Sequence, residues 1–393
     1  MCHLRKFASA IVHNLSSTYN PSPSSAHLLS HSIRSRTIEA FADAVNTQIR
    51  SFDSWCAEKE QAICHASAGL GDPLIVSLLR LDKDVRDTFT GTFEALLNLL
   101  HRVAGYICQS RDRLDIAVWN MVNMPTKVPP SAASSLLLDL LLQATEEQAA
   151  MGNAQTSLYL SAVFARTVEP VWEMVGKWLM DGMPIRTPWD SADAQTLDEE
   201  FFIEDNELQV MDPDFWSDGY VPRGPVALEG HQKSQSAVPV FLEPAVDQIL
   251  SAGKAVGLLR TMGTHLSAEH DSELSTLLKW GSFTNLVDAN STISKDCQSL
   301  SRLISDEIAA YCSSVGMRLS RVLTEDCGLS RHVAAINGLF LMTRGDDITN
   351  FTDILFAKVS PSDHNGSFVN LNAEPVDGRS AILARLPLAK QCF

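Results

Sequence analysis

Apolar side chains recur every three or four residues over long stretches of the chain, and this is the period of an amphipathic helix. The first clear stripe, over residues 38–56, consists of Ile38, Phe41, Val45, Ile49, Phe52 and Cys56. A second stripe, over residues 85–107, consists of Val85, Phe89, Phe93, Leu96, Leu100, Val103 and Ile107. Similar patterns predict further helices over residues 135–150, 156–180, 243–262, 298–321 and 333–357.

Two prolines fall inside these predicted helices. Pro170 lies in the middle of 156–180, where its ring and missing N–H should kink or split the helix. Pro244 lies in the first turn of 243–262, where a missing N–H costs nothing.

Strand patterns are few. The clearest is EFFIEDNELQV, in which two short apolar runs flank a turn at Asp205 and Asn206. No short internal repeat is evident, which disfavours a regular solenoid. The sequence therefore predicts an all-α protein of irregular antiparallel helical bundles, with at most a small β-hairpin near residues 200–211.

Charge is distributed unevenly along the 393 residues, whose formal net charge is −16. Eleven carboxylates fall between residues 190 and 218 with no Lys or Arg among them. Such a balance argues against nucleic-acid binding, which needs a basic surface, and against docking on an anionic membrane. It permits a basic protein partner, although solubility alone would also explain it.

The eight cysteines are scattered and form no C-x-x-C motif, which indicates reduced thiols in a cytosolic or nuclear protein. We expect no signal peptide, because His13 and Asn14 interrupt the short apolar stretch that follows the N-terminal bases. The most apolar stretch, SSLLLDLLLQA, is too short to span a bilayer and contains Asp139.

No catalytic or metal-binding motif survives inspection. Gly253-Lys254 lacks the spacing of a phosphate-binding loop, so we expect Lys254 to be a solvent-facing helix residue. The stretch from Asp288 to Ser299 lacks the Gly and Glu of a calcium loop. His265 and His270 are five residues apart and share a helix face poorly, and Cys64-His65 is a poor nucleophile–base pair. Paired carboxylates of the acidic run could act as acid and base, but solvated charge explains them better. We expect no cofactor, no metal and no enzyme activity.

The acidic run also contains Phe201, Phe202, Phe215 and Trp216. An acidic tail without aromatic residues would be solvated, whereas rings at this density favour burial. We therefore expect these four rings to be buried against the flanking helices, with the carboxylates outside in water. Burying one such ring is worth about 1.5–3 kcal/mol, so four can hold a loop in place.

Several of these segments follow one another in an order that resembles the gamma-tubulin complex protein family, also called the Spc97/Spc98 family. They are the helix with Trp172, Trp178 and Gly182; the EFFI segment Glu200, Phe201, Phe202 and Ile203; the segment Phe215, Trp216 and Tyr220; and the helix entry with Pro239, Phe241, Leu242, Ala245, Ile249, Leu250, Gly253 and Lys254. A last segment has Leu341, Gly345, Asp346, Phe351 and Leu355. The resemblance covers residues 35–360, and we expect the matched positions to keep helices in register.

The resemblance implies two helical domains. Residues 1–265 would be an N-terminal domain, lacking its start, that packs laterally against neighbouring subunits. Residues 266–393 would be the incomplete beginning of the C-terminal domain, to which the family resemblance assigns gamma-tubulin contact. The longer link between Gly182 and Glu200, and Asp347 where Phe is common, are more similar to the divergent fifth or sixth paralogues.

The function that this resemblance implies is a non-catalytic scaffold subunit acting in microtubule nucleation. Its partners would be gamma-tubulin and other subunits of the complex, without nucleic acid or membrane insertion. It would act in the cytoplasm on the cytoskeleton, at microtubule-organising centres or spindle poles. The alternatives are another helical tethering or adaptor scaffold, and an all-helical enzyme whose site is assembled from distant residues.

Overall fold

The computed structural model describes residues 1–18, 35–68, 77–108, 128–185, 197–226, 234–263, 297–341 and 345–359. The chain divides into two compact units, Met1–Gly316 and Met317–Phe393. Within the described residues the structure is mostly helical with one two-stranded antiparallel sheet, which confirms the predicted fold class. The division at residues 265 and 266, drawn from the family resemblance, stays a prediction.

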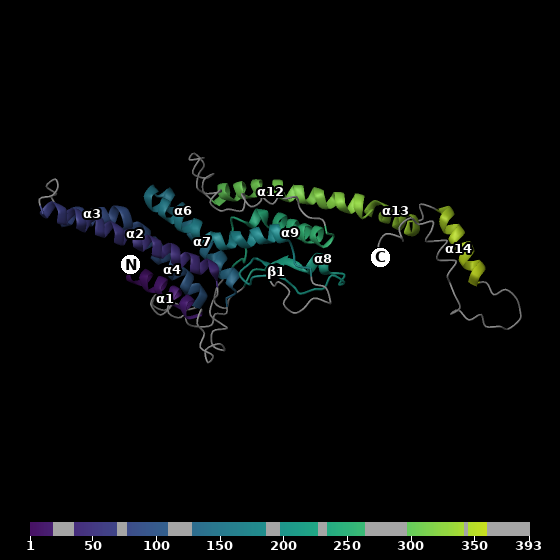
Figure 1. Ribbon diagram of the computed structural model, residues 1–393, viewed down its shortest axis with the longest axis horizontal. Helices are drawn as coiled ribbons and strands as arrows, with labels where there is room; N and C mark the ends of the chain where they lie inside the picture. The colour runs from purple at the N-terminus through teal and green to yellow at the C-terminus, as the bar shows by residue number, and fades with distance from the viewer. Residues whose placement is uncertain are drawn as a thin grey trace. The chain divides into compact units, whose positions relative to one another are not determined.

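The helices of the first unit mostly follow the predicted stripes (Figure 1). They are α1 (Cys2–Thr18), α2 (Arg36–Ser67), α3 (Leu78–Val85), α4 (Gly91–Cys108), α6 (Pro130–Ala150), α7 (Ala154–Asp181), α8 (Phe215–Asp218), α9 (Val246–Thr261) and α12 (Cys297–Arg321), whose last turns enter the second unit. A π-helical segment, η2 (Arg86–Thr90), joins α3 to α4, and a 3₁₀ turn, η3 (Glu243–Ala245), leads into α9 with Pro244 in its first turn, as predicted.

Helix α7 is the central element of the first unit, and it packs against α2, α6 and α9. Its buried face includes Leu160, Val171, Trp172, Val175 and Trp178. The helix continues through Pro170, so this proline does not split it, and the predicted alternative of a kink stays a prediction. Packing on several sides stabilises the helix enough to offset the backbone hydrogen bond that proline removes.

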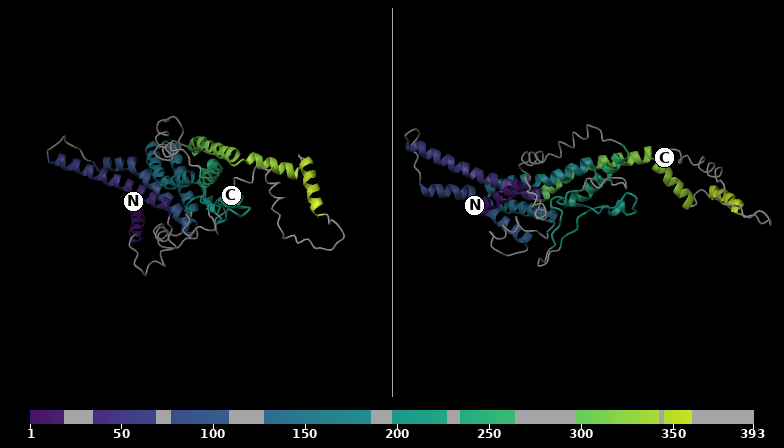
Figure 2. Two further views of the ribbon diagram at one scale, coloured as in Figure 1. Left: turned by 45° about the vertical axis from the view of Figure 1, so that its right-hand side comes forward. Right: turned by 60° about the horizontal axis from the view of Figure 1, so that its bottom comes forward.

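Helix α2 lies beside the run α3–η2–α4, as both views in Figure 2 show. Phe52 contacts Phe89 at 5.1 Å and Phe93 at 6.0 Å between ring centroids, and Lys59 pairs with Asp84 at 3.6 Å. The contacts pair later residues of α2 with earlier residues of the other run, so the two rods are antiparallel. The predicted stripe of α2 is buried from Ile38 to Ile49, whereas Phe52 is half-buried and Cys56 is exposed.

The predicted hairpin forms with a different second strand. Strand β1 (Ile203–Asp205) begins where the pattern placed a strand, but it pairs antiparallel with β2 (Tyr220–Pro222). Ile203 faces Pro222 and Asp205 faces Tyr220. The intervening residues 206–219 form turns and the short helix α8 rather than a tight turn at Asp205 and Asn206.

The described part of the second unit consists of the end of α12, the π-helical segment η4 (Val322–Asp326), α13 (Leu329–Phe340) and α14 (Gly345–Val359). The apolar stripe over 333–357, expected as one helix, is thus divided between α13 and α14. Asp346 and Asp347 lie in the first turn of α14, where carboxylates interact favourably with the helix dipole.

Helices α7 and α9 approach closely because glycines lie at their contact. Gly182 ends α7 with φ +71° and ψ −177°, a backbone conformation that is nearly exclusive to glycine. A Cβ atom added there would lie 2.2 Å from the backbone N of Gly257 on α9. On α9 itself, a Cβ at Gly253 would lie 2.1 Å from Nε1 of Trp178. The Met183 N–H donates to the Gly253 carbonyl at 2.9 Å, which fixes this approach.

We predict that Gly182→Ala lowers the free energy of unfolding by about 3–5 kcal/mol, because backbone strain and overlap with α9 add together. The matched control is Gly152→Ala in the turn between α6 and α7. Gly152 also has a positive φ, +80°, but an added Cβ meets nothing within 4 Å. The control should lose only about 1–2 kcal/mol. Denaturant unfolding followed by circular dichroism measures both, and equal losses would contradict the role of the α7–α9 contact.

Candidate functional site: the connector between α7 and α9

The connector, residues 197–226, is held to the helices by a cluster of rings. Phe201, Phe202, Phe215 and Tyr220 are each no more than 2% exposed. The Trp178 ring on α7 contacts Phe201 at 6.1 Å and Tyr220 at 5.6 Å between centroids, and Phe215 contacts Tyr220 at 6.3 Å. Three of the four rings expected inside are therefore buried, and Tyr220 is buried with them.

Trp216 corrects the fourth expectation, because its side chain is 45% exposed. In the short helix α8 adjacent residues point in different directions, so burying Phe215 turns its neighbour outward. The Trp216 ring rests edge-on against Phe215 at 5.1 Å. It is not the core anchor that the sequence predicted.

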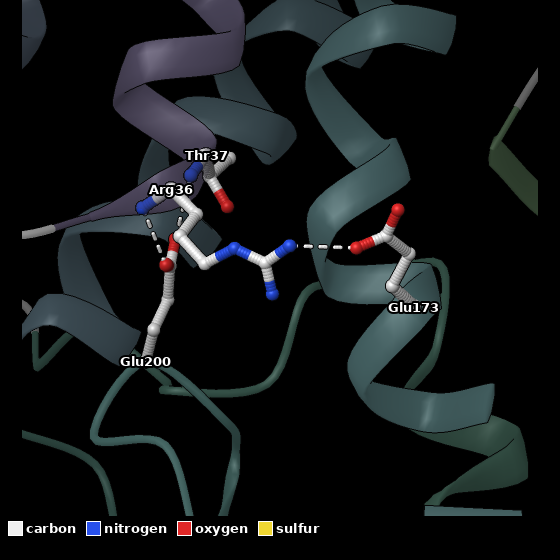
Figure 3. Close-up of polar contacts among 4 residues, drawn as sticks. All are labelled: Arg36, Thr37, Glu173 and Glu200. Atoms are coloured by element: carbon white, nitrogen blue, oxygen red, sulfur yellow. Dashed lines mark hydrogen bonds and ion pairs between the residues drawn. The ribbon is translucent and has the colours of Figure 1, made fainter. Parts of the chain in front are cut away.

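Glu200 is the second correction, since we expected the carboxylates of this segment to lie in water. Its side chain is 3% exposed and lies at the N-terminus of α2. Oε2 accepts from the Arg36 backbone N–H at 2.7 Å, and Oε1 accepts from the Thr37 backbone N–H at 3.0 Å (Figure 3). Oε1 also accepts from the hydroxyls of Ser35 at 2.8 Å and Ser134 at 2.6 Å.

These contacts explain why a carboxylate is stable at this buried position. The first N–H groups of a helix lack partners within the helix and carry partial positive charge, so an anion there is favoured. Ser35 is the N-cap of α2 and also accepts from the Ile38 N–H at 3.2 Å. The Arg36 guanidinium points away and pairs with Glu173 on α7 at 2.7 Å (Figure 3). Glu200 thus joins the connector to α2 and, through Ser134, to α6.

Arg223 follows β2 and forms hydrogen bonds at the end of the β1–β2 pair where Ile203 faces Pro222. Its Nε donates to the Phe201 carbonyl at 2.8 Å, and its backbone N–H donates to the Phe202 carbonyl at 2.8 Å. The guanidinium also lies 3.7 Å from Glu204. The Tyr220 hydroxyl donates to the Pro184 carbonyl, beyond the end of α7. The buried rings are therefore positioned by hydrogen bonds as well as by packing.

The sequence predicted that Lys254 faces solvent, but in the structure its side chain contacts the connector. It is half-buried on α9, and its Nζ donates to the Trp216 carbonyl at 2.9 Å. Burial lowers the pKa of this amine, and nearby Asp218 raises it in part. Trp178 makes a parallel connection, because its Nε1–H donates to the Ile249 carbonyl of α9 at 2.8 Å. Both side chains fix α9 against its neighbours.

Asp139 of α6 binds the segment that leads into α9. This carboxylate lies in the Leu-rich face of α6, where it accepts from the Val240 backbone N–H at 2.9 Å and from the Gln235 amide at 3.5 Å. Burial raises the pKa of Asp139 to about 6, the two hydrogen bonds lower it in part, and Glu243 raises it. Next to it Phe241 and Leu242 are fully buried, and Phe241 packs against Phe164 of α7 at 5.7 Å.

The structure brings most of the family-motif positions together. In the first unit the buried motif positions are Trp172, Trp178, Gly182, Glu200, Phe201, Phe202, Ile203, Phe215, Tyr220, Pro239, Phe241, Leu242 and Gly253, whereas Lys254 is half-buried and Trp216 is exposed. Gly345, Asp346 and Phe351 lie in the second unit, on α14, where each is exposed.

Sequence reasoning missed four residues of this arrangement. Ser35 could have been found as a helix N-cap before the stripe that begins at Ile38, and Gly257 by its spacing of four from Gly253. Asp139 was noticed only as a charge in an apolar run, where a partner should have been expected. Nothing in the sequence distinguishes Ser134 from its neighbours Ser131 and Ser135.

The described residues hold neither a candidate metal cluster nor a candidate membrane span. No group of three His, Cys, Asp or Glu side chains among them could hold a metal ion, and no helix among them is long and apolar enough to cross a bilayer. The stretch 288–296 that resembles a calcium loop, the pair His265 and His270, and residues 186–196 of the longer link lie outside the described residues. What the described site does chemically is fix α2, α6, α7 and α9 around one connector.

The chain matches a known protein family. The family described as gamma tubulin complex component N-terminal matches residues 1–326, which is most of the chain. The matched stretch contains the entire connector and the helices that pack on it.

We predict that Glu200→Ala lowers the free energy of unfolding by about 2–4 kcal/mol, because the buried N–H of Thr37 and the part-buried N–H of Arg36 would lose their acceptor. Glu199→Ala is the matched control, since Glu199 is adjacent and exposed. It should change stability by less than about 0.5 kcal/mol. Urea unfolding curves measure the difference. Similar midpoints for the two variants would show that the buried carboxylate does not hold α2.

We predict that Asp139→Asn changes the pH dependence of stability. The pKa of Asp139 is raised from 3.8 to about 6 in the folded chain, so the folded state binds the proton more tightly than the unfolded state. Stability of the unmodified protein should therefore fall as pH rises from about 4 to 6, by about 1–3 kcal/mol relative to the variant. The difference between the two should level off above pH 6. Melting curves from pH 4 to 8 measure it, and parallel profiles would contradict the assignment.

Proposed function

The chain belongs to the gamma-tubulin complex component family, and from that membership we propose that it is a non-catalytic scaffold subunit acting in microtubule nucleation. The family match over residues 1–326 is the observation that carries this proposal. Members of this family are structural subunits of the gamma-tubulin complex. The proposed mechanism is templating: subunits pack side by side and present gamma-tubulins at the spacing of a microtubule end, without bond chemistry.

The first unit has physical properties that suit such a role. A template transmits geometry only if each subunit holds its shape under load, so its helices must be fixed relative to one another. Glu200, Trp178 and Asp139 each connect elements distant in sequence, and each does so with hydrogen bonds inside the packed unit. These contacts support a rigid first unit.

We further propose that the two parts of the chain divide the work. Residues 1–265 would pack laterally against neighbouring subunits, and residues 266–393 would contribute to gamma-tubulin contact. The proposed partners are gamma-tubulin and other components of the complex, and the proposed location is the cytoplasmic cytoskeleton at microtubule-organising centres or spindle poles. The longer link after Gly182 and the Asp at 347 favour a divergent paralogue of the fifth or sixth type.

The test is affinity purification of the full chain from its own cells, followed by cross-linking and mass spectrometry. We expect gamma-tubulin and other components of the complex to co-purify. Cross-links to gamma-tubulin should arise from residues 266–393, and cross-links to neighbouring components from residues 1–265.

The Gly182→Ala variant, compared at equal expression, tests whether the α7–α9 contact shapes the first unit. If it does, this variant should lose the lateral partners. Recovery of vesicle-tethering subunits without gamma-tubulin would overturn the scaffold assignment. Gamma-tubulin cross-links confined to residues 1–265 would overturn only the proposed division of work.

A further inference from the structure

The loop from β1 through α8 exposes apolar side chains that the packing of the connector leaves outside. We call residues 204–218 the acidic loop. Met211 is 84% exposed and Trp216 is 45% exposed, while Leu208 and Val210 are half-buried. Trp172 and Trp178 are at most 2% exposed, so the outward position of Trp216 is unusual among the described tryptophans on α7 and α8. A contiguous exposed apolar patch marks an interaction surface, and these side chains lie close together along the chain in one short segment.

The acidic loop is held in one shape by its own backbone. The Asn206 N–H donates to the Gly219 carbonyl at 2.9 Å, the Phe215 N–H to the Asp212 carbonyl at 3.1 Å, and the Asp218 N–H to the Asp214 carbonyl at 2.8 Å. The buried Phe215 ring and the Lys254 bond to the Trp216 carbonyl fix α8 on the unit beneath. A surface that is already ordered loses little conformational entropy when a partner binds it.

Charge defines the chemistry of the partner. The loop carries six carboxylates and no Lys or Arg: Glu204, Asp205, Glu207, Asp212, Asp214 and Asp218. Two bases among the described residues contact this loop and both are engaged, because Arg223 lies against Glu204 and Lys254 binds the Trp216 carbonyl. The field at the exposed ring therefore attracts cations and repels nucleic acids and acidic proteins. A second copy of this chain, with a net charge of −16, is disfavoured for the same reason.

We propose that the acidic loop is a docking surface for a basic segment of another protein that carries an apolar or aromatic anchor. Met211 and Trp216 receive the apolar anchor, and the Trp216 ring face also suits stacking with an arginine of the partner. The surrounding carboxylates pair with the partner's Lys and Arg side chains. The surface uses residues of the first unit alone and does not depend on gamma-tubulin binding.

The first experiment places the photo-cross-linker p-benzoylphenylalanine at position 216 of the full chain, in cells, and identifies the attached peptides by mass spectrometry. The same cross-linker at Met151, which is 69% exposed in the turn between α6 and α7, is the control. We expect position 216, and not position 151, to capture recurrent peptides with a net positive charge and at least one apolar residue. Acidic peptides, peptides of this chain itself, or no capture above the control would overturn the proposal.

The second experiment measures binding of the captured segment, as a labelled synthetic peptide, to the purified full chain by fluorescence anisotropy. The double variant Met211→Ser, Trp216→Ser should raise the Kd by about tenfold. The double variant Glu207→Gln, Asp214→Asn should also raise the Kd, and its Kd should depend less on salt concentration. Glu207 and Asp214 are exposed, so their double variant tests the surface even if the Met211 and Trp216 variant does not fold.

The matched control is Glu58→Gln with Glu60→Gln on α2, which removes two exposed charges far along the chain. It should leave the Kd within about twofold, since screening limits such distant charges. Equal weakening by the two charge pairs would show that only net charge matters, and would overturn the proposal. Retained affinity in the Met211 and Trp216 variant would overturn it as well.

Discussion

A carboxylate can be buried only where its oxygens find donors, and this constraint on Glu200 organises the first unit. The donors come from the start of α2 and from Ser134 on α6, while Glu200 itself belongs to the connector. The two helices and the connector must therefore keep fixed distances from one another. Phe201 and Phe202 follow directly along the chain, so placing Glu200 also directs these rings toward the core beside Trp178.

A second constraint acts where the end of α7 meets α9, because glycines there let the two backbones approach closely. Gly182, Gly253 and Gly257 leave the space, and Trp178 fills it while donating to α9. The polar contact at α2 and the close contact at α9 fix the same connector from two directions. A unit held in this way can carry a defined geometry to its neighbours, which is what a templating scaffold requires.

The two faces of the connector carry different kinds of side chain. Its buried rings and Glu200 face the helices, and the remaining carboxylates face water together with Trp216 and Met211. One segment can therefore stabilise the unit and present a surface, because the two sets of residues do not overlap. Asp139, which titrates near pH 6, holds the segment that follows the connector, so both ends of this region are tied to α6 by carboxylates.

The sequence by itself predicted most of the helices and the family, because apolar side chains on a regular helix repeat with a fixed period and the motif segments keep their order. It also indicated that rings would anchor the acidic segment. Only the tertiary structure decided that Trp216 faces out, that Glu200 is buried, and that β1 pairs with residues 220–222. An irregular connector has no hydrophobic period that shows which of its side chains will be buried. The hydrogen-bond partners of Glu200, Ser35 and Ser134, lie 165 and 66 residues away from it along the chain. Such contacts form only when the helices have already been brought together.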